Sequence, residues 1–79
     1  MYKRQPAPST ALIALGRNAR SLREKKKLTQ EALGERAELH TTYISDIERG
    51  VRNPSAVILL RLAKALSVEV GDLFKGVKA

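Results

Sequence analysis

The sequence predicts an all-α protein, a compact five-helix domain in which the second and third helices form a helix-turn-helix. Apolar residues recur at three- and four-residue spacing, residues suited to helix caps stand between these runs, and no segment alternates as a half-buried strand does. A chain of 79 residues is too short for two cores. We therefore expect one domain, 11–76, between a flexible basic arm at 1–10 and a tail at 77–79.

A first helix is expected from Ala11 to about Lys26, after an arm with two prolines, two cations and no hydrophobic periodicity. Charged residues separate the apolar positions of this helix, so it has one face for the core. Its closing lysines suit the negative end of the helix dipole. The apolar positions are Leu12, Leu15, Ala19 and Leu22.

Two short helices follow, with only three residues between them. Thr29 is a good N-cap for the second helix, which ends near Ala37. The third helix spans 41–49 and stops before Gly50, a suitable left-handed C-cap. Two short helices joined by such a turn cross at a large angle, and this unit can present its second helix to a major groove.

The remaining apolar periodicity predicts two more helices. Ser55 caps a fourth helix in which Arg61 and Lys64 face water, and 68–74 is expected to form a short fifth helix. The apolar positions of the fourth helix are Ile58, Leu59, Leu62, Ala63 and Leu66.

At about 100° per residue, the third helix has one polar and one apolar face. Short side chains near its N-terminus let the backbone approach base edges, which are read by hydrogen-bond donors and acceptors in the groove. The polar face, which is expected to contact DNA, holds Thr41, Thr42, Ser45, Asp46 and Arg49. The other face holds Ile44, Ile47 and Glu48, with Tyr43 at its edge.

The charge balance predicts an anionic partner. The net charge is +7, and residues 1–27 hold eight basic residues against Glu24 alone. Nucleic acid is the leading interpretation, a membrane surface is a weaker one, and a merely solvated face is the alternative. The basic arm is expected to serve as a tether. The alternative is that its Lys3 and Arg4 enter a minor groove.

Composition also excludes several classes of function. Because there is no cysteine and only one histidine, His40, we expect no disulfide, no metal site and no cofactor. The chain has no Gly-rich phosphate loop, and Ser45 lies on a different helix face from His40, so we do not expect an enzyme. With no apolar stretch near the roughly 20 residues of a membrane span, and no secretory signal, a cytoplasmic protein is predicted.

The segment LTQEALGERAELHTTYISDIERG resembles the helix-turn-helix of the Xre/Cro superfamily, which includes the lambdoid phage repressors. The likeness runs from about Leu15 to Phe74, because LGRNARSLREKKKLTQ, VRNPS and LLRLAKALSVEVGDLF resemble the flanking helices of that domain. TYISDIERG and the following RN further resemble the controller proteins of restriction-modification systems. The resemblance implies a repressor-like DNA-binding domain that represses or activates transcription, with a restriction-modification operon as its target.

The resemblance also implies how the third helix is supported. Gln30 would bind a phosphate and brace that helix, although it is also simply a good helix former in an exposed first turn. Arg23 and Glu48 occupy the positions of a partly buried ion pair that ties the first helix to the third. We expect this pair to be structural.

The start of the third helix, with the residue before it and the loop after it, would contact DNA. Threonine and serine distinguish bases less uniquely than longer polar residues do. Discrimination between DNA sequences would therefore depend largely on indirect readout, or on Arg49 and Arg52 at the edge of the groove. The alternatives are Tyr43 as a core edge and His40 as an ordinary surface residue. The implied base contacts are Thr41, Thr42 and Ser45, the backbone contacts His40 and Tyr43, and the loop contacts Arg52 and Asn53.

Three positions depart from the family pattern. Glu38 stands in the turn where glycine is usual, Ser67 stands where a C-cap glycine is common, and His40 replaces a better N-cap. A left-handed conformation at Glu38 or Ser67 would cost about 1 kcal/mol each. These departures affect stability more than fold.

A homodimer is expected, because one recognition helix reads too few base pairs for a rare site. A two-fold dimer would place two such helices about 34 to 36 Å apart on a pseudo-palindrome. RNA polymerase becomes a further partner if the protein activates transcription. The alternative function is a protein-interaction module, an antitoxin or a bridging coactivator, with the same fold. The predicted dimer interface on the fourth and fifth helices comprises Val57, Leu60, Val68, Val70 and Phe74.

Overall fold

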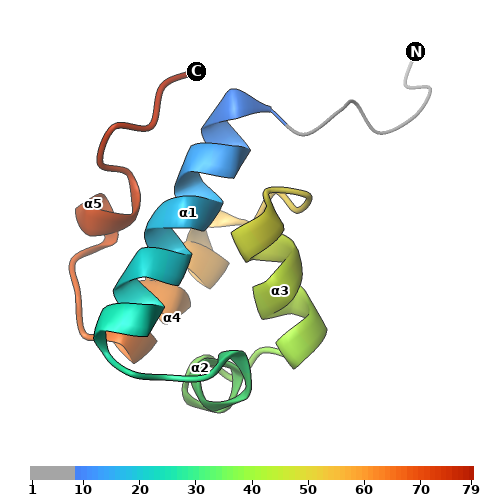
Figure 1. Ribbon diagram of the computed structural model, residues 1–79, viewed down its shortest axis with the longest axis vertical. Helices are drawn as coiled ribbons and strands as arrows, with labels where there is room; N and C mark the ends of the chain where they lie inside the picture. The colour runs from blue at the N-terminus through green and yellow to red at the C-terminus, as the bar shows by residue number, and fades with distance from the viewer. Residues whose placement is uncertain (1–8) are drawn as a thin grey trace.

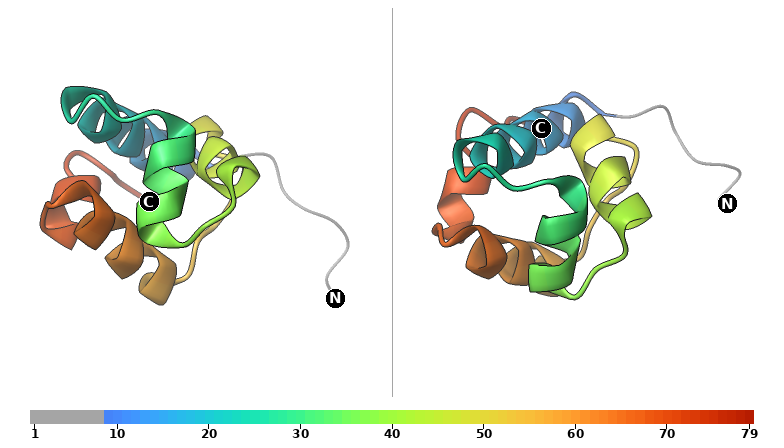
Figure 2. Two further views of the ribbon diagram at one scale, coloured as in Figure 1. Left: turned by 90° about the horizontal axis from the view of Figure 1, so that it is seen from below. Right: turned by 60° about the horizontal axis from the view of Figure 1, so that its bottom comes forward.

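A computed structural model describes residues 9–79, so Lys3 and Arg4 of the expected arm lie outside it. The described chain is all-helical, as predicted, and has no strand. Figure 1 shows α1 with α3 on one side, α5 on the other and α4 behind. Figure 2 shows α2 crossing the end of the domain, where it packs on α3 and α4. The helices are α1 (Thr10–Lys25), α2 (Gln30–Ala37), α3 (Thr41–Arg49), α4 (Ala56–Leu66) and α5 (Val70–Leu73).

The helix α1 starts earlier than its apolar pattern indicates. The side chain of Ser9 accepts a hydrogen bond from the Leu12 amide at 3.0 Å, so Ser9 is the N-cap and Thr10 is already helical. The expected arm boundary after residue 10 is therefore wrong by two residues. At the other end, Lys27 adopts a left-handed conformation with φ of 58°, which separates α1 from α2.

Capping side chains define the helix-turn-helix. Thr29 Oγ1 accepts from the Ala32 amide at 3.0 Å and starts α2, as expected. Glu38 ends α2 in the left-handed region, with φ of 58°, in the place where glycine would be unstrained. The bounds of α3 and the left-handed Gly50 agree with the sequence prediction. The turn between the two helices is three residues long.

The C-terminal part differs from the prediction in two places. The fifth helix is only Val70–Leu73, because the Val68 amide donates to Ala63 and so belongs to the left-handed C-cap of α4 at Ser67. Glu69 and Asp72 then form a capping box that starts α5. The expected tail at 77–79 is not free throughout, because Val77 packs against the core.

Arg61 does not simply face water, as its helical position predicted. Its side chain folds back from α4, and its Nε donates to the Ala37 carbonyl at 3.1 Å while Nη2 donates to the Glu38 carbonyl at 2.6 Å. The last carbonyls of a helix have no partner within the helix. Arg61 therefore stabilises the end of α2 and the left-handed residue that opens the turn. Lys64 is exposed, as expected.

Side chains from all five helices make one core. Within residues 9–79, no helix is both long enough and apolar enough to cross a bilayer. Since burial of each large aliphatic side chain contributes about 1.5 to 3 kcal/mol, this core carries most of the stability. Its largest fully buried side chains are Leu33, Ile44, Ile47, Leu62, Leu66 and Leu73.

Gly16 sets how closely α1 and α3 approach. A Cβ atom at this position would meet the Ile47 carbonyl oxygen and would lie 2.7 Å from the Glu48 carbonyl oxygen. These neighbours are backbone atoms of α3 and cannot turn aside as a flexible side chain does. The distance between α3 and α1 therefore depends on Gly16.

Replacing Gly16 with alanine is expected to lower the free energy of unfolding by about 1 to 3 kcal/mol, because the added methyl group forces α3 away from α1. Urea titration followed by circular dichroism measures the loss. Gly71→Ala is the matched control, since no atom lies within 4 Å of the position its Cβ would take. Equal changes in both variants would show that the close approach does not constrain the helices.

Candidate nucleic-acid interface

The helix α3 has one face in the core and one toward solvent. Ile44 and Ile47 are 1% and 2% exposed and pack inward against α1 and α2. The opposite face carries exposed or half-buried polar side chains. We call this surface the α3 polar face, and it comprises Thr41, Thr42, Ser45, Asp46 and Arg49.

His40 starts α3 although it is an unusual N-cap. Its Nδ1 accepts a hydrogen bond from the Thr42 amide at 3.1 Å, which replaces the usual hydroxyl or carboxylate cap. The imidazole is exposed beside the first turn of the α3 polar face. His40 therefore has a defined structural contact and lies next to the residues that were expected to meet DNA.

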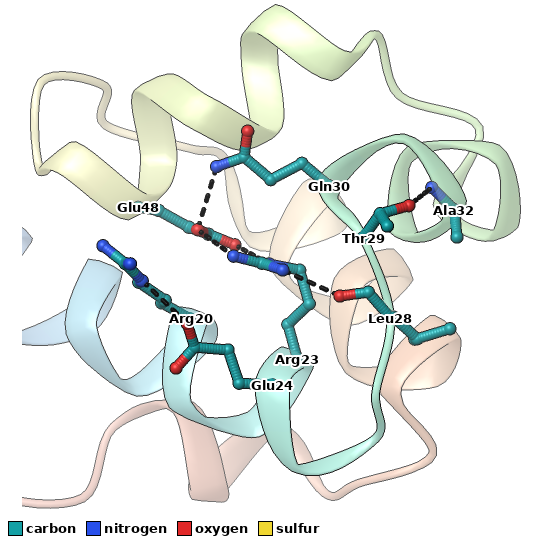
Figure 3. Close-up of polar contacts among 8 residues, drawn as sticks. All are labelled: Arg20, Arg23, Glu24, Leu28, Thr29, Gln30, Ala32 and Glu48. Atoms are coloured by element: carbon teal, nitrogen blue, oxygen red, sulfur yellow. Dashed lines mark hydrogen bonds and ion pairs between the residues drawn. The ribbon is translucent and has the colours of Figure 1, made fainter.

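A partly buried ion pair fixes α3 on α1 (Figure 3). Arg23 of α1 donates from Nε to Glu48 Oε2 at 2.7 Å and from Nη2 to Glu48 Oε1 at 3.1 Å. The two side chains are 12% and 4% exposed. Arg23 Nη1 also donates to the Leu28 carbonyl at 2.7 Å, which ties the loop before α2 to the same group. The bidentate geometry restrains both helices.

Gln30 joins this ion pair from α2. Its Nε2 donates to Glu48 Oε1 at 3.0 Å, so α1, α2 and α3 meet at one carboxylate (Figure 3). Hydrogen bonding to Glu48 is the largest effect on Arg23 and raises the pKa of its guanidinium. Arg23 therefore stays charged within this network. We call Arg23, Gln30 and Glu48 the brace.

A second ionic cluster lies at the C-terminal end of the α3 polar face. Asp46 Oδ1 accepts from Arg49 Nη2 at 2.7 Å, and Asp46 Oδ2 accepts from Arg52 Nη2 at 3.0 Å. The Arg52 guanidinium also stacks on the Tyr43 ring, 4.4 Å from its centroid. Tyr43 is half-buried and Asn53 of the same loop is exposed. The structure thus brings the loop after Gly50 onto α3.

The two arginines lower the pKa of Asp46 below its ordinary value of 3.8, mainly through the hydrogen bond from Arg52 and next through that from Arg49. A carboxyl group whose pKa falls on folding stabilises the native state above its ordinary pKa, and this contribution is lost as the pH falls. The cluster is therefore fully formed near neutral pH. Sequence reasoning missed this arrangement, since Arg52 is six residues away in a loop.

Three large hydrophobic side chains on α4 and at the end of α5 are exposed, and we call them the apolar surface. Val57, Leu60 and Phe74 are 64%, 55% and 44% exposed, which is unusual for such large hydrophobic side chains. Val68 and Val70, expected in the same surface, are only partly exposed because they pack against the core. The five residues of the predicted dimer interface therefore differ in exposure, with Val57, Leu60 and Phe74 the most exposed.

No metal centre accompanies these clusters in the described part of the chain. No three side chains of histidine, aspartate or glutamate lie together there in a way that could hold an ion.

Two short helices, a three-residue turn and a second helix with an outward polar face define a helix-turn-helix DNA-binding domain. Residues 20–73 match the family model HTH_3, described as helix-turn-helix, and the chain belongs to this family. The resemblance to Xre/Cro proteins is thereby confirmed, and the protein is a DNA-binding transcription regulator.

Its relatives include proteins of restriction-modification systems. The control protein C.BamHI of Bacillus amyloliquefaciens is 44% identical over 62 residues, which cover 77% of this chain and 76% of that protein. The crystal structure of the controller protein C.AhdI from Aeromonas hydrophila is 41% identical, with a TM-score of 0.82 over 84% of this chain and all of that one. A C.Esp1396I tetramer bound to its natural 35-base-pair operator contains a chain 33% identical, with a TM-score of 0.79 over 87% of this chain and 91% of that one.

Proposed function

We propose that this protein is a regulator of the restriction-modification controller type, which binds a pseudo-palindromic operator as a homodimer. The observation that carries the proposal is the α3 polar face, held outward by the brace and extended by the loop that carries Arg52. The likeness to named control proteins supports a restriction-modification operon as the target.

In this proposal DNA lies along α3 and the N-terminus of α2. Thr41, Thr42 and Ser45 meet base edges, since they are the short polar side chains at the start of α3. Gln30 binds a phosphate with its second amide hydrogen, because only one of the two is needed for Glu48. We assign contacts with the sugar-phosphate backbone and the groove edge to His40, Tyr43, Arg49, Arg52 and Asn53.

The dimer places two α3 helices about 34 to 36 Å apart, one helical turn of DNA. The exposed side chains of Val57, Leu60 and Phe74 support an interface formed by α4 and α5, with Val68 and Val70 at its edges. Two linked half-sites give affinity for a rare sequence that one helix cannot supply.

We further propose that the protein acts in the cytoplasm by binding alone, without catalysis and without a cofactor. Its partners are then double-stranded DNA and a second copy of itself. Repression needs only occupation of the operator, whereas activation needs an additional contact with RNA polymerase.

Selection of binding sites from a random duplex pool tests this function directly. The purified protein is mixed with the pool at near-physiological salt and with excess competitor DNA, and the retained duplexes are sequenced. The proposal predicts an enriched pseudo-palindrome. A folded protein that enriches no motif would contradict it and would favour the interaction module, an antitoxin or a coactivator, with only non-specific DNA binding.

Alanine substitutions should separate base contacts from phosphate contacts. Thr42→Ala is expected to reduce the preference for the correct base at one position by roughly five-fold or more, because a base contact is lost. Gln30→Ala should weaken selected and mixed-sequence duplexes alike, because phosphates carry no sequence information. Fluorescence anisotropy with both duplexes measures the effects. Equal, sequence-independent losses in the two variants would overturn the assignment.

A further inference from the structure

Asp46 stands out on the α3 polar face because it is acidic where DNA is expected. A carboxylate repels phosphates, yet this one lies one helical turn after Thr42 on the same face of α3. Only 16% of its side chain is exposed, and each oxygen accepts a hydrogen bond from a different arginine. Its acceptors are thus already engaged within the protein.

The two arginines are restrained but still accessible. The side chains of Arg49 and Arg52 are 63% and 45% exposed, and each gives Asp46 only one of its terminal nitrogens. A guanidinium has five N–H donors, so free donors remain on both side chains. Arg52 is held from a second direction by the Tyr43 ring at 4.4 Å. Long side chains held in this way lose less entropy when they bind.

An unrestrained arginine side chain beside DNA binds the nearest phosphate, and phosphate contacts give affinity without sequence information. An arginine held at the groove edge instead meets guanine, whose O6 and N7 accept two hydrogen bonds from one guanidinium. The carboxylate favours the second outcome, because it directs the two side chains and repels phosphates from the same place.

We propose that Asp46 is a positioning residue for DNA specificity: it holds Arg49 and Arg52 toward guanine edges in the groove and withholds them from phosphates. This inference rests on the proposed function, because it requires that α3 lies in the DNA groove. It assigns Asp46 itself no base contact, which differs from the direct DNA contact expected from the sequence.

The first test uses a duplex of mixed sequence, so it needs no operator. Asp46→Asn frees both arginines, and each new phosphate contact steepens the log-log dependence of affinity on salt by about 0.9. We expect the slope to steepen by up to about 1.8. Glu35→Gln is the matched control, because it removes the same charge from an exposed position on α2. Asp46→Ser replaces Asp46→Asn if thermal unfolding shows that the asparagine variant does not fold.

The second test compares the selected operator with the mixed duplex. Asp46→Asn should reduce the ratio of the two affinities by about ten-fold or more, because base discrimination is lost. The same substitution in an Arg49→Gln, Arg52→Gln background should change neither the ratio nor the salt slope, since Asp46 acts through those side chains.

Three outcomes would overturn the inference. The first is a salt slope for Asp46→Asn equal to that of Glu35→Gln, and the second is an effect of Asp46→Asn that persists in the Arg49→Gln, Arg52→Gln background. The third is an enriched motif for Asp46→Asn that differs from the wild-type motif only at one cytosine, because a carboxylate accepts a hydrogen bond directly from that base. Failure of the proposed function is a separate result, because the wild-type protein would then enrich no motif while the mixed-duplex comparison still tests Asp46.

Discussion

Arg23→Ala is expected to lower the free energy of unfolding by about 3 to 5 kcal/mol, since it leaves a buried carboxylate without its cation. Glu48 is 4% exposed, and only the amide of Gln30 would then remain to bind it. Small domains have roughly 5 to 15 kcal/mol of stability in total. The variant should therefore be close to unfolding at growth temperature, and its DNA binding should fail for that reason. Chemical denaturation measures the loss.

The double variant Arg23→Met, Glu48→Leu is the control for this result. It removes both charges and fills their space with apolar atoms, so no unpaired charge stays buried. We expect it to lose less than half as much stability as the single variant. A double variant as unstable as Arg23→Ala would show that packing, and not the unpaired charge, causes the loss.

Leu60→Glu is expected to abolish the dimer and to weaken operator binding by on the order of a hundred-fold, because linked half-sites gain that much from a shared interface. Leu60 is 55% exposed, so a charge there costs the monomer little stability. Sedimentation velocity reports the association state, and anisotropy reports the affinity.

Ser21→Glu adds the same charge at an exposed position of α1 and controls for repulsion between protein and DNA. It should leave the protein dimeric. A wild-type protein that stays monomeric at micromolar concentration, or a Leu60→Glu variant that sediments as the wild type does, would contradict the assigned interface.

Helix positions with strong local signals were predictable from the sequence. The bounds of α3 follow from its apolar periodicity and from Gly50, and Thr29 and Ser55 mark the starts of α2 and α4. The start of α1 was less predictable, because Thr10 is exposed and adds nothing to the apolar pattern. The left-handed Lys27 was missed because it ends a run of lysines that suits a helix C-terminus.

Contacts between elements were not predictable from local patterns. Helical spacing places Arg61 outward, but its length lets it return to the last carbonyls of α2. The sequence pattern predicts that Val68 is helical, but its amide donates to the Ala63 carbonyl and completes the C-cap of α4. Asp46 was placed correctly on the polar face, whereas its pairing with Arg52 depends on how the loop after Gly50 folds back. The residues of the α3 polar face follow from periodicity, whereas the resemblance to the family indicates Gln30, His40, Arg52 and Asn53. The partners of these side chains follow from tertiary structure.

Amide chemical shifts during titration with the selected duplex test most directly whether DNA lies on the α3 polar face. The largest changes are expected at the start of α2, on residues 40–46 and on the loop that carries Arg52 and Asn53. Changes centred instead on α5, or on the surface that Arg36, Arg61 and Lys64 line between α2 and α4, would contradict it.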